Sequence, residues 1–191
     1  MKKEGKIKET AIRTIAEEAD SIGKLVRSVD NDFMACVERI LECRGRVIVT
    51  GIGKSAIIGH KIVATLNSTG TPASFLHAAD AIHGDLGMIR KEDIVICISK
   101  SGETPEIRLL VPLLKEYAGT LIAMAGNRQS YLATHADLVI DTTVEKEACP
   151  NNLAPPSRPT AQLVIADAIS VCLLEARGFT PHTFSRLHTA G

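Results

Sequence analysis

Aromatic residues are scarce in this chain of 191 residues, which has no tryptophan, two tyrosines and four phenylalanines. So few rings leave little material for stacking nucleic-acid bases or for a carbohydrate-stacking platform. An excess of one charge is also lacking, because Lys plus Arg and Asp plus Glu each number 22. No global positive field therefore attracts nucleic acid or an anionic membrane, and no apolar run approaches the roughly 20 residues that span a bilayer. We expect neither a nucleic-acid nor a membrane partner.

The five cysteines show no C-x-x-C spacing, and their number is odd. Cys97 lies in a predicted buried strand and Cys172 in a predicted apolar helix, so we interpret both as core thiols. The sequence begins without a recognisable signal peptide. These features favour a reducing compartment, and we expect a cytoplasmic protein.

Apolar periodicity alternates between helix and strand along the chain. Helices are predicted over residues 6–26, 32–41, 55–66, 104–117, 130–135 and 160–176, and strands over residues 46–50, 72–76, 93–99, 120–126 and 137–141. This alternation favours an α/β fold, a doubly wound three-layer αβα sandwich around a five-stranded parallel sheet. We expect a single domain over residues 1–191, with helices for packing or oligomerisation in 1–44 and the α/β core in 45–191.

The segment Ile94–Glu106 reads IVICISKSGETPE and joins a predicted buried strand to the start of a helix. Three hydroxyl residues and a glycine follow the strand within six positions: Ser99, Ser101, Gly102 and Thr104. Pro105 suits the first turn of a helix, and Glu106 favours the positive end of its dipole. One hydroxyl alone would indicate a helix cap, but the cluster beside free backbone N–H groups indicates an anion site. The sequence therefore predicts a ligand that carries a phosphate.

A second strand–helix junction, Gly51–Ala56, reads GIGKSA. A Walker A loop would need a glycine where Ile48 stands. A dinucleotide fingerprint would need an acidic residue at the end of the next strand, where His77 stands. What remains is a glycine-rich turn that carries Lys54 and Ser55 at the carboxyl edge of the sheet, where open α/β folds bind ligands. Lys54 is either a solvated lysine or a substrate contact, and its place between small residues favours the contact.

The segment Phe75–Ile89 contains three polar residues that zinc accepts as ligands: His77, His83 and Asp85. The spacing of the two histidines matches no standard helix-face pair, and no third ligand is evident, so structural or substrate-binding roles are favoured over a metal. Glu145 and Glu147 follow the last predicted strand, again at the carboxyl edge of the sheet.

Together these segments resemble the sugar isomerase (SIS) domain family, whose fold is flavodoxin-like. Within the family they are most similar to the arabinose-5-phosphate isomerases. The motifs that carry the resemblance are GIGKS, NSTGTP, HAADAIHGDLGMI, ISKSGETPEI, EKEACPNNLAP, LLEARGF and FSRLH. Many members carry a C-terminal pair of CBS modules, and this sequence resembles the short form without them.

The resemblance implies reversible isomerisation between D-ribulose 5-phosphate and D-arabinose 5-phosphate for 3-deoxy-manno-octulosonate synthesis in lipopolysaccharide or capsule pathways. The family's catalytic positions fall on Lys54, Glu103, Glu147 and His188. Substrate contacts are implied at Gly53, Ser55, Gly70, Thr71, His83, Ser99, Ser101 and Thr104. His77 matches a histidine associated with zinc in some members, although no cofactor is required for the implied reaction. The family also implies a homo-oligomer, a tetramer or a dimer, with shared active sites.

Two segments depart from the family pattern. Pro156, Ser157, Arg158, Pro159 and Thr160 stand where Thr-Ser-Ser-Thr-Thr is usual. His188 is followed by Thr-Ala-Gly instead of Pro-Gly-Gly. Two alternatives to the implied isomerase therefore stay open, a different SIS isomerase and a sugar-phosphate sensor without catalytic activity.

Overall fold

Five parallel strands form the central layer of the molecule, whose computed structural model describes residues 2–145, 157–180, 183 and 185. Their bounds are β1 Val47–Gly51, β2 Ala73–His77, β3 Ile94–Ser99, β4 Thr120–Ala125 and β5 Leu138–Asp141. The strands lie in the order β2-β1-β3-β4-β5, and every neighbouring pair is parallel. The predicted five-stranded parallel sheet is confirmed, and its order is that of flavodoxin-like folds.

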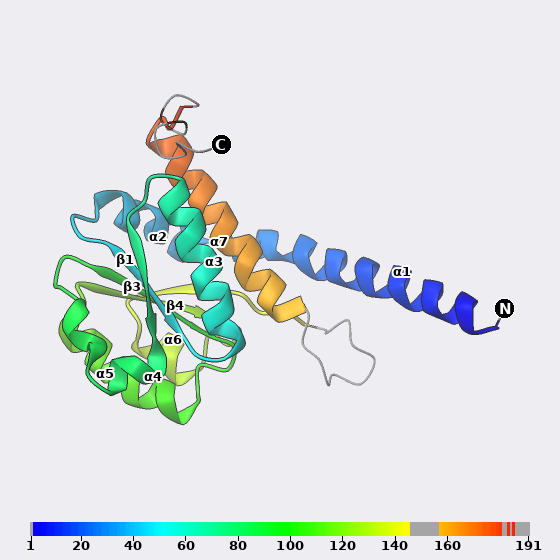
Figure 1. The fold of residues 1–191 in the computed structure, drawn as a ribbon, viewed down its shortest axis with the longest axis horizontal. Coiled ribbons are helices and arrows are strands. Elements are labelled where there is room, and N and C mark those ends of the chain that lie inside the picture. The colour runs from blue at the N-terminus through cyan, green and yellow to red at the C-terminus, as the bar shows by residue number, and fades with distance from the viewer. Residues whose placement is uncertain (1, 146–156, 181–182, 184, 186–191) are drawn as a thin grey trace.

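Helices cover both faces of this sheet (Figure 1). Their bounds are α1 Lys2–Gly23, η1 Lys24–Ser28, α2 Asn31–Glu42, α3 Lys54–Ser68, α4 Ala78–Ile82, η2 Asp85–Met88, α5 Pro105–Tyr117, α6 Tyr131–His135 and α7 Ser157–Ala176. Apolar side chains of α2, α3 and α7 form one core with the sheet, and those of α4, α5 and α6 form the other. The three predicted layers are therefore confirmed. The short α4 and η2 were not predicted from the apolar periodicity.

The strand β3 shows how one sequence serves two cores. Ile94, Ile96 and Ile98 belong to the core under α2, α3 and α7, whereas Val95 and Cys97 belong to the core under α4, α5 and α6. All six residues of the strand are buried, as expected for a parallel strand covered on both faces. The carboxyl end of β3 is thereby held rigidly where the hydroxyl cluster begins.

The cysteine thiols differ in how far they are buried, and burial determines the pKa of each thiol. Cys97 and Cys36 are both fully buried, and this desolvation raises the pKa of each thiol to about 12. Cys97 is therefore the core thiol that its sequence context predicts. Cys172 packs against the core from α7 but is only half-buried, so the interpretation as a core thiol is correct only in part.

The helix α7 begins at Ser157, three residues earlier than predicted, so Arg158 and Pro159 lie in its first turn. A proline is tolerated there because the first N–H groups of a helix have no intrahelical acceptor. Among the described residues, α7 is the one helix long and apolar enough to cross a membrane, with a mean hydropathy of 1.4. It packs against α3 and contributes buried residues to the core, which is the behaviour of a core helix.

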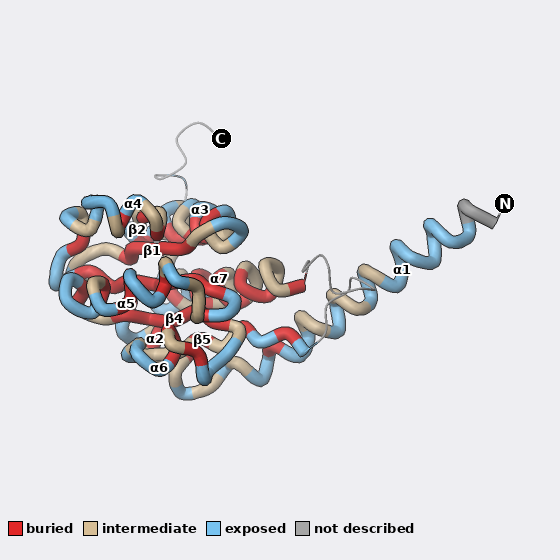
Figure 2. The backbone as a smooth tube through the Cα atoms, turned by 90° about the horizontal axis from the view of Figure 1, so that it is seen from below, coloured by how far each residue is buried: buried red, intermediate tan, exposed pale blue. Residues whose placement is uncertain are grey.

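The helix α1 projects away from the α/β core (Figures 1 and 2). Apolar side chains recur along it, and those of Ile7, Ile12 and Ile15 are more than half exposed. Only part of the helix packs on the rest of the chain, against α7 and η1. The apolar stripe of α1, defined here by Ile7, Ala11, Ile12 and Ile15, is thus uncovered in a single chain.

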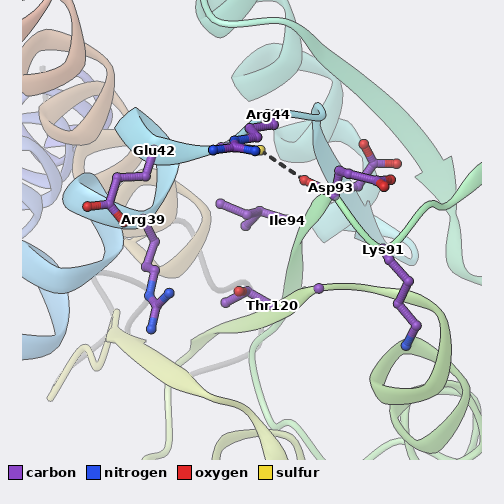
Figure 3. A pocket seen from close by; sticks show the side chains of 10 residues that line it. Arg39, Glu42, Arg44, Lys91, Asp93, Ile94 and Thr120 are labelled. Atoms are coloured by element: carbon purple, nitrogen blue, oxygen red, sulfur yellow. Dashed lines mark hydrogen bonds between the residues drawn. The ribbon is translucent and has the colours of Figure 1, made fainter.

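A polar pocket of about 270 Å³ lies at the amino edge of the sheet, where β3 and β4 begin (Figure 3). It is lined by cations such as Arg39 and Arg44 and by acids such as Glu42 and Asp93. Asp93 is buried and accepts hydrogen bonds from the N–H groups of Arg46 and Arg90 at 2.8 and 2.9 Å. This carboxylate fastens the starts of β1 and β3 together, so the pocket marks a structural joint at the edge opposite to the predicted site.

Candidate functional site

The carboxyl ends of all five strands meet at one edge of the sheet, because every pair is parallel. The chain passes from β1 outward to β2 and then returns to β3 on the other side of β1. This reversal makes the gap between β1 and β3 the switch point, where ligands of open α/β sheets bind. In the ladder Gly51 is the partner of Ile98, so the turn after β1 and the loop after β3 lie side by side.

The turn after β1 leads into α3 without any side-chain cap, and Gly53 at the N-cap has φ of 59°. A Cβ on Gly51 would lie 3.2 Å from the Ile98 carbonyl and from Ser55, so the backbone approaches closely here. Lys54 is the first residue of α3 and is exposed, with no hydrogen-bond or ion-pair partner among the described residues. An ammonium at a helix N-terminus opposes the dipole. The charge of Lys54 therefore does not stabilise α3.

The loop after β3, defined here as the anion loop of residues 99–104, is ordered by its own hydroxyls. Ser99 Oγ accepts from Gly102 N–H at 3.1 Å, and Ser101 Oγ accepts from Glu103 N–H at 3.3 Å. Thr104 Oγ1 caps α5 by accepting from the Ile107 N–H. An oxygen that accepts in this way still has its own O–H proton to donate. Three hydroxyl donors and the N-terminus of the 13-residue helix α5 thus stand together, which is a suitable environment for a phosphate.

Glu103, inside this loop, is held by two partners. Its Oε1 accepts from the Tyr131 N–H at 2.6 Å, and its Oε2 forms an ion pair with Arg108. The bond from the Tyr131 N–H and the nearby guanidinium of Arg108 together keep the pKa of Glu103 below its usual value. A lowered pKa makes a weaker base, so the geometry does not favour proton transfer by Glu103, one of the catalytic positions that the family resemblance implies.

Another carboxylate of the same segment was assigned only a helix-dipole role from the sequence. Glu106 lies in the first turn of α5 and is half-buried. It has no hydrogen-bond or ion-pair partner within the described part of the chain. It is the second residue of α5, whereas Glu103 precedes the N-cap Thr104, and its place after Pro105 was a signal available in the sequence. Of the two carboxylates that begin this segment, Glu103 is engaged and Glu106 has no partner among the described residues.

The structure does not bring every predicted contact to this edge. Gly70 and Thr71 precede β2 and therefore lie at the amino edge, separated from the site by strands about 16 Å long. Thr71 is buried and bonded to Arg177, while a Cβ on Gly70 would touch Phe179. For a site formed within one chain, the prediction that Gly70 and Thr71 contact the ligand is wrong. Gly70 and Thr71 instead form a turn that contacts Arg177 and Phe179, the residues that follow α7.

The two predicted histidines lie nearer to the edge. His77 ends β2, and its Nδ1 accepts from the Ala79 N–H at 3.3 Å, so it caps α4. His83 follows the end of α4 and is exposed. No group of three or more His, Cys, Asp or Glu side chains that could hold a metal exists in the described ranges. The described residues around His77 therefore do not form a closed zinc site by themselves.

Two predicted catalytic residues, Glu147 and His188, lie outside the described residues. The described chain stops nearby at Glu145, which follows β5 at the carboxyl edge. Glu145 forms an ion pair with Lys24 at 3.3 Å, and Lys24 also pairs with Asp20 of α1 at 2.9 Å. The junction between α1 and η1 is thus attached to the rim of the site.

Comparison with known proteins gives consistent results. The family model described as SIS domain matches residues 40–171. The arabinose 5-phosphate isomerase KdsD of Pseudomonas aeruginosa is 50% identical over 182 residues, which are 95% of this chain and 56% of that protein. The arabinose 5-phosphate isomerase KpsF of Escherichia coli O6:H1 is 44% identical over 184 residues, with coverages of 95% and 56%. The chain spans about half the length of these curated relatives.

A solved structure from E. coli CFT073, in complex with arabinose 5-phosphate, matches almost completely. It is 37% identical, with a TM-score of 0.91, and the match covers 96% of this chain and 98% of that one. The likeness therefore extends over the sheet, the helices on both of its faces and the carboxyl edge.

The anion loop can be tested with inorganic phosphate. Removing the Ser101 hydroxyl in Ser101→Ala deletes one donor, and we expect phosphate to bind about 3- to 10-fold more weakly in isothermal titration calorimetry. Ser68→Ala is the matched control, because Ser68 donates to the Thr65 carbonyl at the far end of α3. Equal affinity of Ser101→Ala and the unaltered chain would contradict the assignment of this loop.

Proposed function

Because the chain belongs to the SIS domain family, we propose that it is an aldose–ketose isomerase that interconverts D-ribulose 5-phosphate and D-arabinose 5-phosphate. The observation that carries the proposal is the juxtaposition, at the switch point, of the anion loop with Lys54, which has no partner among the residues that the structure describes. The names of the relatives and the arabinose 5-phosphate bound in the solved structure support this choice of substrate. We place the reaction in the cytoplasm, within 3-deoxy-manno-octulosonate synthesis.

The proposed chemistry divides the substrate between two neighbouring elements. The anion loop and the N-terminus of α5 hold the phosphate, which is remote from the reacting carbons and anchors the sugar. A base removes a proton from C1 of ribulose 5-phosphate, and the electron pair forms an enediolate. The C2 oxygen gains a proton while O1 loses one, and the base returns its proton to C2, which completes the conversion to the aldose. No external oxidant or reductant is needed.

Lys54 provides the charge that this intermediate requires. Negative charge accumulates on the C2 oxygen as the enediolate forms, and a preorganised cation there lowers the barrier. The uncapped first turn of α3 adds backbone N–H donors with the same polarity. Glu106, which follows the anion loop in the first turn of α5, carries the proton, because Glu103 is already held by Tyr131 and Arg108. Glu147 and His188 remain candidate catalytic residues from the family resemblance.

Replacing Lys54 tests whether its charge stabilises the enediolate. We expect Lys54→Met to lower kcat by about 10²–10³-fold in a coupled assay with ribulose 5-phosphate, because the enediolate loses its cation. Lys91→Met, at the amino edge of the sheet, is the matched control and should retain full activity. Turnover of a hexulose or heptulose phosphate instead would favour a different SIS isomerase. Phosphate binding without turnover of any C5 to C7 ketose phosphate would favour a sensor.

Matched substitutions of Glu103 and Glu106 distinguish which of the two carboxylates transfers the proton. Glu106→Gln keeps the shape and removes the basic oxygen, so we expect kcat to fall by about 10²-fold or more. Glu103→Gln can still accept from the Tyr131 N–H, and we expect kcat to stay within about tenfold of the original, the ion pair being exposed. Steady-state kinetics of both variants decide the question. The reverse order of the two effects would return the proton-transfer role to Glu103.

We also propose that the chain forms a homo-oligomer through α1. A helix that exposes an apolar stripe to water gains stability when a second copy covers the stripe. The stripe of α1 is exposed although the rest of the chain has an extensive core. A second copy is the favoured partner because the family resemblance implies an assembly with shared sites.

Charged substitutions on α1 test this assembly. Ile15→Glu places a carboxylate within the stripe, and we expect the assembly to dissociate to monomers in light scattering coupled to size exclusion. Arg13→Glu introduces the same side chain on the opposite, charged face of α1 and should leave the mass unchanged. A monomeric unaltered chain, or equal dissociation by both variants, would argue against the α1 interface.

A further inference from the structure

We propose that Arg108 and Tyr131 are positioning residues of the anion loop, acting through Glu103. The three residues form a unit, named here the clasp, which fastens the loop to α5 on one side and to α6 on the other. The inference rests on the proposed role of the loop as the phosphate anchor. It adds to that role two residues that need not touch the substrate.

The first half of the clasp is a pair of hydrogen bonds between the loop and the start of α6. Glu103 Oε1 accepts from the Tyr131 N–H at 2.6 Å, and the Gly102 carbonyl accepts from the Leu132 N–H at 3.0 Å. Tyr131 and Leu132 are the first two residues of α6, so their N–H groups have no acceptor within the helix. The anion loop therefore supplies the hydrogen-bond acceptors that the first N–H groups of α6 lack within the helix.

The contact between loop and helix is also sterically close. Gly102 has φ of 66°, and a Cβ on it would lie 2.2 Å from the hydroxyl oxygen of Ser130. Ser130 is fully buried, and its hydroxyl caps α6 by accepting from the Ala133 N–H. Since only glycine fits here, the loop packs directly against the start of α6, and the hydrogen bond from the Tyr131 N–H to Glu103 holds it in that position.

The second half of the clasp is Arg108, one turn into α5. Its guanidinium forms an ion pair with Glu103 Oε2 and lies over the ring of Tyr131, 4.8 Å from the centroid. The ring of Tyr131 in turn stacks on His135 at 4.0 Å. A planar guanidinium can serve the carboxylate and the ring together. Arg108 thus joins α5, the loop and α6 at one point, and it is the charged side chain that acts on Glu103.

The contacts of Glu103 fix the position of the anion loop. Both oxygens of Glu103 are engaged by Tyr131 and Arg108, while Ser101 and Thr104 on either side of it in the sequence have hydroxyl protons to donate. A loop fixed before the ligand arrives loses less conformational entropy on binding. Weakening the clasp should therefore weaken phosphate binding equally in the ground state and in the transition state, which raises KM and leaves kcat unchanged.

The test measures phosphate affinity and kinetics on the full chain. We expect Arg108→Met to bind inorganic phosphate about 3- to 10-fold more weakly in calorimetry, because the ion pair and the cation–π contact are both lost. KM for ribulose 5-phosphate should rise by the same factor, with kcat within about twofold. Arg108→Lys keeps a cation near Glu103 and should recover part of the affinity. Arg90→Met, at the amino edge, is the matched arginine control and should change neither value.

A double-mutant cycle completes the test. If Arg108 acts through Glu103, the variant Glu103→Gln with Arg108→Met should bind phosphate no more weakly than the weaker single variant. Additive losses, an unchanged affinity in Arg108→Met, or a fall in kcat at constant KM would each overturn the proposal. Phosphate binding by the unaltered chain without turnover would refute the proposed reaction and leave the clasp standing. Failure of the unaltered chain to bind phosphate would overturn the clasp.

Discussion

The direction of the chain in the sheet is the constraint on which the site depends. Parallel pairing sends the carboxyl ends of β1 and β3 to the same edge, and the strand order makes them neighbours. The chain must then turn into a helix after each strand, so two helix N-termini point at one place. Asp93 secures the same two strands at their other end. Two fully buried central strands thus bring two segments that are far apart in the sequence together on one polar surface.

The two helix N-termini differ in a way that suits different parts of a sugar phosphate. Thr104 caps α5, and the hydroxyls of the anion loop are ordered by their own backbone, which suits a fixed anion. The start of α3 has no cap and carries Lys54 against its dipole, which suits charge that develops during a reaction. In the proposed mechanism the N-terminus of α5 binds the phosphate and the N-terminus of α3 stabilises the intermediate. Both lie at the same edge of the sheet.

Much of this could be predicted from the sequence, because strand and helix periods and the run from Ser99 to Thr104 are local signals. Partners distant in the sequence could not. Glu103 is held by Tyr131, 28 residues away, and no pattern around Glu103 indicates that contact. Motif resemblance also carries no information about which edge a turn occupies. Gly70 and Thr71 were therefore assigned to the ligand, although they precede a strand and lie at the amino edge.

The arm formed by α1 has a consequence for how the protein responds to dilution. If a second copy covers its stripe, the free energy of the folded arm contains a term that grows with protein concentration, by mass action. The arm continues through Lys24 to Glu145 at the rim of the site. Dilution would then release the arm and loosen the rim together, and specific activity would become a property of the concentration as well as of the sequence.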